Sequence, residues 1–172
     1  TRETRRPSLT TGADPTDTVG PMPTADVTNG EASSVVLYEV SERIATVTLN
    51  RPEARNALSS TLLRDLNGRM HEANDRDDVD VIILTGADPA FSAGLDLAEH
   101  LTRSAIASVH HSRMWHRVLE KVEFGGLIVI AALTGAVIGG GLEVALASHY
   151  RVAVPTAKFG VPEVKLGILP GA

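Results

Sequence analysis

Residues 127–143 have the sequence LIVIAALTGAVIGGGLE, in which an apolar run leads into three consecutive glycines and ends on an acid. The short run 127–133, rich in branched apolar residues, predicts a buried strand. A short helix over about 142–147 is expected to follow the glycines. A strand that passes through a glycine turn into a helix is typical of an α/β fold.

The same alternation of strands and helices extends outward from this stretch. Residues 35–40 and 44–49 are rich in β-forming residues and predict a hairpin. A helix capped by Ser59 or Ser60 should follow, because apolar residues from Leu62 to Met70 recur at helical spacing. Further patterns predict a strand at 79–84, a helix at about 106–122 and a strand at 150–154. The chain is therefore expected to be an α/β protein.

The first 34 residues differ in composition from the rest of the chain. They are rich in Thr, Pro, Gly, Ser and Asp and lack apolar periodicity, which predicts a disordered N-terminal arm. Residues 35–172 are expected to form the folded domain.

Composition excludes several classes of function. The chain has no cysteine, so thiolate metal sites and disulfides are ruled out and a cytoplasmic location is expected. With 16 basic and 21 acidic residues, it has no basic stripe of the kind that binds nucleic acid. The apolar stretch from Gly125 to Ala147 is interrupted by glycines and by Glu143, so no membrane span is expected.

The glycine turn before Glu143 is suited to binding an anion. Exposed N–H groups at a helix N-terminus can stabilise a phosphate or a developing oxyanion. A phosphate loop is disfavoured because no Gly-Lys-Ser/Thr follows. Close packing of helix on strand is the structural alternative. It leaves Glu143 unexplained, because an acid in an apolar segment is costly unless it is paired or used.

Two further segments combine turn residues with an acid. In residues 91–97, FSAGLDL, small residues after a buried strand let the backbone approach a ligand. Taken alone, this segment favours the structural alternative, a plain turn into a helix with Asp96 near its N-terminus. In residues 159–171, FGVPEVKLGILPG, Glu163 stands among apolar residues. A first-turn helix acid paired with Lys165 is the structural alternative for Glu163.

These segments, in this order, resemble the enoyl-CoA hydratase/isomerase (crotonase) family. Residues 51–58, RPEARNAL, are similar to the family's first CoA-binding loop, and the resemblance covers residues 35–172. It implies a crotonase-like spiral of repeated β-β-α units, incomplete at the C-terminus. It also implies a homotrimer or hexamer for the complete protein and an acyl-CoA substrate, with no cofactor besides its coenzyme A.

The resemblance also implies roles for eight residues. The backbone N–H groups of Leu95 and Gly140 would form the oxyanion hole, where each such donor is worth about 3–4 kcal/mol. Glu143 would help to activate the attacking water, and Glu163 would deliver a proton to the α-carbon. Contacts with coenzyme A, largely through the main chain, would come from Ala57, Ala93, Asp96 and Leu97.

Hydration of 2-trans-enoyl-CoA is the first expectation, because both glutamates are present. The alternatives are isomerisation of an enoyl-CoA, thioester hydrolysis or dehalogenation, and a non-catalytic fragment that binds coenzyme A or joins other subunits. Ala98 stands where many relatives have a lysine near the CoA phosphates, so that contact is expected to be lacking. No metal site is expected, because the spacing of His110, His111 and His116 does not place all three on one helix face.

Overall fold

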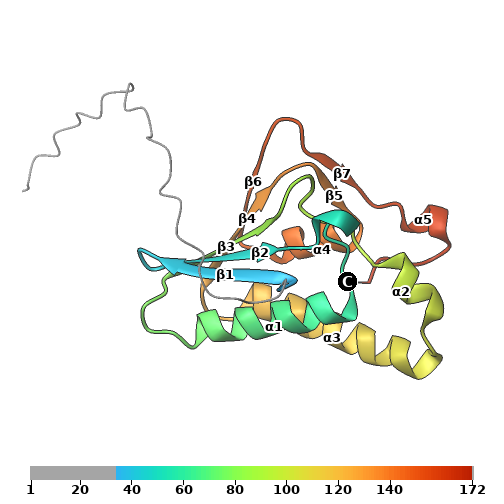
Figure 1. Ribbon diagram of the computed structural model, residues 1–172, viewed down its shortest axis with the longest axis horizontal. Coiled ribbons are helices and arrows are strands. Elements are labelled where there is room, and N and C mark those ends of the chain that lie inside the picture. The colour runs from blue at the N-terminus through green and yellow to red at the C-terminus, as the bar shows by residue number, and fades with distance from the viewer. Residues whose placement is uncertain (1–33, 172) are drawn as a thin grey trace, which may run out of the picture. The chain divides into compact units, whose positions relative to one another are not determined.

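The computed structural model describes residues 34–171, and its main sheet has five strands in the order β1-β2-β3-β4-β6 (Figure 1). β1 and β2 are an antiparallel hairpin, and the other neighbours are parallel. The strands are β1 (Val36–Ser41), β2 (Ile44–Leu49), β3 (Val81–Gly86), β4 (Ile128–Leu133) and β6 (Tyr150–Ala153).

Two long helices, α1 (Ser60–Asn74) and α3 (Ala105–Phe124), pack against each other beneath the sheet (Figure 1). Ser59 caps α1 by accepting a hydrogen bond from the N–H of Leu62 at 3.2 Å, as the sequence predicted. Leu66 and Met70 of α1 and Val118 of α3 are fully buried. The core therefore consists of the inner faces of these helices and the alternate strand residues that face them.

The β-β-α order repeats along the chain. β4 is followed by β5 (Ala136–Ile138) and α4 (Gly140–Ala147), and β6 is followed by β7 (Lys158–Gly160) and α5 (Glu163–Leu166). In both repeats the first strand lies in the main sheet, while β5 and β7 pair with each other in a second, parallel sheet. The predicted spiral of β-β-α units is confirmed.

Most predicted elements are present with small shifts of their ends. The short strands β5 and β7 were not predicted, and β5 lies where the sequence indicated only a glycine turn. The helix α2 (Leu97–Thr102), capped by Asp96, is the helix that the structural alternative for residues 91–97 predicted. A three-residue strand is too short to show a periodic pattern. The predicted disordered arm falls almost wholly on residues outside the described range and stays a prediction.

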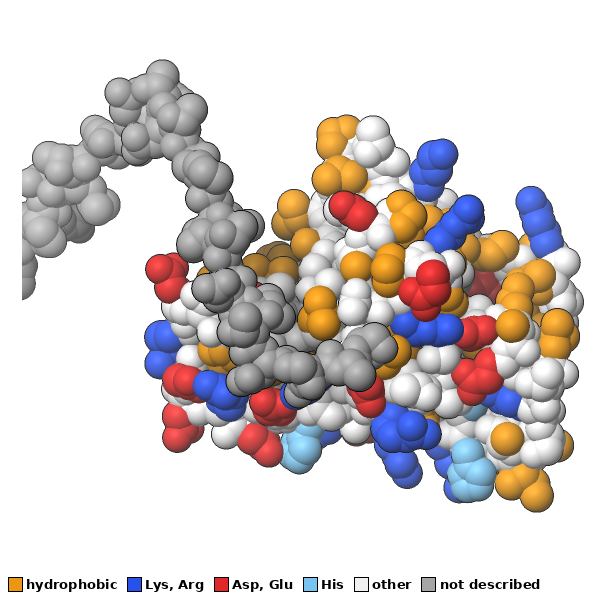
Figure 2. Space-filling view, in the orientation of Figure 1, with side chains coloured by type: hydrophobic (Ala, Val, Ile, Leu, Met, Phe, Trp, Pro, Cys, Tyr) orange, Lys and Arg blue, Asp and Glu red, His pale blue; other side chains and the backbone are white. Residues whose placement is uncertain are grey.

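Large apolar side chains are exposed on the second half of the structure. They gather along the upper edge and the right-hand end of the molecule in Figure 2, where Figure 1 shows β6, β7 and α5. All four residues of β6 are exposed, and it is an edge strand of the main sheet. Within residues 150–171, the most exposed of these side chains are Tyr150, Val152, Val161, Val164 and Leu169. No helix within residues 34–171 is long and apolar enough to cross a membrane.

Candidate active site

Two loops that are distant in sequence are joined by backbone hydrogen bonds at the centre of the site. The N–H of Ser92 donates to the carbonyl of Ala136 at 3.0 Å, and the N–H of Ile138 donates to the carbonyl of Ser92 at 3.0 Å. The N–H of Phe91 bonds the carbonyl of Thr134 at 2.8 Å. The turn after β3 is thereby held against β5, just before the glycines.

This pairing brings the peptide of Leu95 close to that of Gly140. Gly94 has φ +85°, and a Cβ on it would lie 2.6 Å from the carbonyl oxygen of Ile138 and 3.1 Å from the nitrogen of Gly140. Among the hydrogen bonds of residues 34–171, none has the N–H of Leu95 or Gly140 as its donor. Two unused donors therefore lie close together, one of them at the N-terminus of α4.

Asn56 holds the loop between β2 and α1 against the same turn. It is fully buried with φ 55°, and its side-chain amide donates to the carbonyls of Ala87 at 2.7 Å and Ala90 at 2.6 Å. Ser92 Oγ donates to the carbonyl of Asn56 at 2.8 Å. Sequence reasoning placed Asn56 only in a loop. The signal it offered was that asparagine tolerates the left-handed conformation better than most residues.

Glu143, on the first turn of α4, accepts hydrogen bonds on both carboxylate oxygens. The indole Nε1 of Trp115 donates to Oε2 at 3.0 Å, and the backbone N–H of Gly171 donates to Oε1 at 2.7 Å. Trp115 is 7% exposed and comes from the face of α3 that meets α4. Sequence reasoning did not assign a site role to Trp115, because its partner is 28 residues away.

Glu163, the first residue of α5, is buried at 8% exposure. Its Oε2 is a buried oxygen that has no hydrogen-bond partner within the described residues. A Cβ on Gly139 would lie 2.7 Å from Glu163 Oε1, and Gly139 has φ +51°. Glycine is thus required there twice, for its backbone conformation and for the space that the carboxylate occupies.

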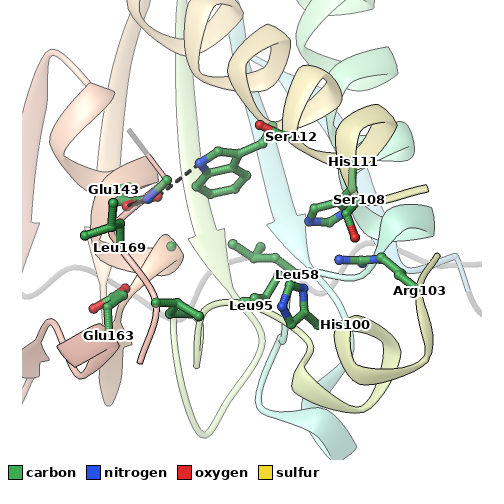
Figure 3. A pocket seen from close by; sticks show the side chains of 14 residues that line it. Leu58, Leu95, His100, Arg103, Ser108, His111, Ser112, Glu143, Glu163 and Leu169 are labelled. Carbon is green, nitrogen blue, oxygen red and sulfur yellow. Dashed lines mark hydrogen bonds between the residues drawn. The ribbon is translucent and has the colours of Figure 1, made fainter. Parts of the chain in front are cut away.

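A cavity of about 180 Å³ unites these groups (Figure 3). Leu95, Gly140, Glu143 and Glu163 all line it, so the structure brings the four predicted catalytic residues together. In Figure 3 the two glutamates lie on one side and Arg103 and His111 on the other. The remaining lining residues are Leu58, His100, Ser108, Ser112, Trp115, Ile168, Leu169 and Gly171.

The four predicted CoA-contact residues lie beside this cavity and do not line it. All four are close in sequence to the lining residues Leu58 and Leu95. Three of them, Ala57, Ala93 and Asp96, are half-buried, and Leu97 is exposed.

Asp96 already has structural partners. Its carboxylate accepts from Arg51 at 2.9 Å and caps α2 through the N–H of Glu99 at 3.2 Å. Burial acts to raise the pKa of Asp96, but these hydrogen bonds and the charge of Arg51 outweigh it, so the pKa is lowered.

A polar cluster occupies the end of the cavity opposite the glutamates. Ser60 donates to Glu99 through both its hydroxyl and its backbone N–H, the latter at 2.9 Å. Arg103 Nη2 lies 3.0 Å from Glu99 Oε1, and His111 Nδ1 lies 3.3 Å from Ser60 Oγ. Burial acts to raise the pKa of Glu99, but hydrogen bonds from Ser60 and Arg103 outweigh it and lower the pKa to about 2.

Of the three histidines considered as metal ligands, His111 alone lines the cavity, and His110 and His116 are exposed. Within the part of the chain that the structure describes, no group of three His, Cys, Asp or Glu residues could hold a metal ion.

The spiral of β-β-α units has the crotonase fold. The family model for enoyl-CoA hydratase/isomerase matches residues 39–172. The chain belongs to the enoyl-CoA hydratase/isomerase family.

Similar proteins support this assignment. The chain is 38% identical to the short-chain-enoyl-CoA hydratase of Clostridium acetobutylicum over 79% of its own length and 52% of the relative. It is 37% identical to the crotonyl-CoA hydratase of Syntrophomonas wolfei, over 79% of this chain and 53% of that relative. The crystal structure of an enoyl-CoA hydratase from Bacillus anthracis matches with a TM-score of 0.77 and 35% identity, over 81% of this chain and 55% of that one. The chain thus spans about half the length of these relatives.

Proposed function

We propose that the protein is an enoyl-CoA hydratase-type lyase that adds water to 2-trans-enoyl-CoA thioesters. The observation that carries this proposal is the joint placement of four groups around one cavity. The backbone N–H groups of Leu95 and Gly140, which have no acceptor within the described part of the chain, share it with the carboxylates of Glu143 and Glu163. Oε2 of Glu163 is a buried carboxylate oxygen with no partner among residues 34–171, and such an oxygen needs a functional explanation.

The N–H groups of Leu95 and Gly140 would bind the thioester carbonyl oxygen. Attack of water on the β-carbon moves negative charge onto this oxygen. Preorganised donors stabilise that charge more than they stabilise the neutral substrate. The donors are rigid because the hydrogen bonds of Ser92 fix the spacing of the two loops.

The two glutamates would carry out the proton transfers that the addition of water requires. Glu143, oriented by Trp115 and Gly171, would hold the water that attacks the β-carbon. The water would lose one proton to Glu143 as its oxygen bonds to the β-carbon, and Glu163, in its protonated form, would deliver a proton to the α-carbon. Transfer of the proton from Glu143 to Glu163 would then restore both side chains, so that one water is added as OH and H. The coenzyme A portion would run past Ala57, Ala93, Asp96 and Leu97, next to the cavity. The reaction needs no cofactor besides the substrate's coenzyme A.

Incubation with crotonyl-CoA, followed by chromatography and mass measurement of the thioester, tests this proposal. The expected product is 3-hydroxybutyryl-CoA, which is heavier than the substrate by one water. Crotonyl-CoA recovered unchanged from a folded chain would contradict the proposal and favour a non-catalytic CoA-binding protein.

Isomerisation of a 3-enoyl-CoA is the second candidate. It is favoured by the difference in hydrogen bonding between the two carboxylates. A double-bond shift can use a single carboxylate, which acts first as base and then as acid. Glu143 accepts two protein hydrogen bonds, whereas Oε2 of Glu163 has no partner in the described residues. In this case the chain would convert a 3-enoyl-CoA into its conjugated isomer, and Glu143→Gln would leave this conversion intact.

A further inference from the structure

The cavity changes character along its length. In Figure 3 Leu58 and Leu95 lie between the glutamates on one side and Arg103 and His111 on the other. An acyl chain whose thioester end is at the glutamates would pass these leucines. Its far end would then reach polar side chains.

Arg103 is the least satisfied group at this polar end. Its side chain is only 6% exposed, and its guanidinium points toward the middle of the cavity in Figure 3. Nη2 is paired with Glu99 at 3.0 Å and also lies 3.3 Å from Ser60 Oγ. Nη1 is buried and has no hydrogen-bond acceptor in the described part of the chain. Leaving a buried donor unpaired is unfavourable, so an acceptor on the ligand would be bound preferentially.

The charges around Arg103 favour an uncharged acceptor. Glu99 is ionised at neutral pH, since its pKa is about 2, and it already balances the charge of Arg103. Burial, followed by the charge of Arg103, lowers the pKa of His111, which keeps its imidazole neutral at pH 7. Glu99, Arg103 and His111 thus carry no net positive charge. A carboxylate on the acyl tail would lose its hydration without gaining a free cation.

We propose that Arg103 binds an oxygen at the far end of the acyl chain, so that the site prefers acyl-CoA thioesters with a hydroxyl or carbonyl group on the tail. This proposal rests on the proposed function, because it assumes that the cavity holds the acyl chain. It concerns the choice of acyl tail, which the proposed hydration at the glutamates does not determine.

Calorimetric titration of the full chain with saturated acyl-CoAs, which cannot be hydrated, tests the preference without turnover. The probes are hexanoyl-CoA, 6-hydroxyhexanoyl-CoA and adipoyl-CoA, with shorter and longer homologues of each. The hydroxylated tail is expected to bind at least about tenfold more tightly than the plain tail of equal length, since hydrogen bonds to charged groups are strong. Adipoyl-CoA is expected to gain less.

Arg103→Met should remove this preference, leaving hydroxylated and plain tails with equal affinity. The matched control is Arg113→Met, because Arg113 is an exposed arginine on α3 outside the cavity. This control should keep the preference. Since Arg103→Met leaves Glu99 without its ion pair, the double variant Glu99→Gln/Arg103→Met is measured too. The double variant should also bind hydroxylated and plain tails with equal affinity, and it removes both charges of the ion pair.

The outcomes separate this proposal from the proposed function. Binding of hexanoyl-CoA with no gain from the hydroxyl would overturn the tail preference and leave the acyl-CoA site standing. A preference that survives in the double variant would also overturn the role of Arg103. A larger gain for adipoyl-CoA would show that the tail group is an anion and contradict the argument from charge. Failure of the folded chain to bind any acyl-CoA would overturn both proposals.

Discussion

At the scale of single residues, the position of Gly94 in the site requires glycine for two reasons. It combines a positive φ with a close approach to the carbonyl of Ile138 and the N–H of Gly140. We predict that Gly94→Ala lowers kcat for hydration by about 10²–10³-fold, the effect of losing one oxyanion donor, because the added methyl pushes the two loops apart. Steady-state kinetics with crotonyl-CoA measures this.

The control for Gly94→Ala is Gly68→Ala, which adds the same methyl where no atom lies within 4 Å. It should leave kcat unchanged. If a folded Gly94→Ala variant kept the parental kcat, the assignment of the Leu95 and Gly140 N–H groups as an oxyanion hole would be wrong.

The sequence predicts some residues of the candidate site and not others. Glu143 and Glu163 stand out because each is an acid in an apolar stretch, and the structure places both at one cavity. Arg103, Trp115 and Asn56 were not predicted as site residues. Their roles arise from partners far along the chain or from burial that only the folded structure creates, and no local pattern signals either.

At the scale of elements, Gly68 weakens helix α1. It lies in the interior of the helix, where glycine is less favourable than alanine, and its surroundings leave room for a methyl group. We predict that Gly68→Ala raises the free energy of unfolding by about 0.5–1 kcal/mol. Urea unfolding followed by circular dichroism measures this. A fall in stability would show that the position is constrained by something other than helix propensity.

Glu99 joins α2 to the start of α1 through Ser60 and makes this contact sensitive to acid. Because its pKa in the folded chain is about 2, below the ordinary 4.5, its contribution to stability is present above pH 4.5. That contribution is lost as the pH falls from 4.5 toward 2. We predict that the wild type loses more unfolding free energy over this range than Glu99→Gln does.

Urea titrations at a series of pH values measure this difference. Glu123→Gln, which changes an exposed carboxylate at the end of α3, is the control and should follow the wild type. Parallel pH profiles for wild type and Glu99→Gln would contradict the role of this contact.

Elements with a clear period were predicted well, and short ones were not. The hairpin, α1, β3, α3 and β4 have apolar patterns long enough to read. By contrast, β5 and β7 have three residues each and exist because they pair with each other across the spiral. Such long-range pairing leaves no trace in either segment alone.

At the scale of the whole molecule, the exposed apolar side chains of β6, β7 and α5 predict self-association. Val152 in β6 is 64% exposed, Val164 in α5 is 84% exposed and Leu169, which follows α5, is 87% exposed; patches of this kind commonly mark interfaces. We expect copies of the chain to associate through this face, and the double variant Val152→Lys/Val164→Lys to shift the equilibrium toward monomer. Light scattering after gel filtration measures this. A wild-type chain that stays monomeric at high concentration would contradict it.

The most direct test of the central claim is the rate of crotonyl-CoA hydration by the wild type and two glutamate variants. Glu163→Gln should lower kcat by about 10²–10⁴-fold, the usual contribution of a general acid or base. Glu123→Gln, an exposed control of the same chemistry, should keep the wild-type rate. If Glu163→Gln hydrated crotonyl-CoA as fast as Glu123→Gln, Glu163 would not carry the proton and the proposed hydratase mechanism would be wrong.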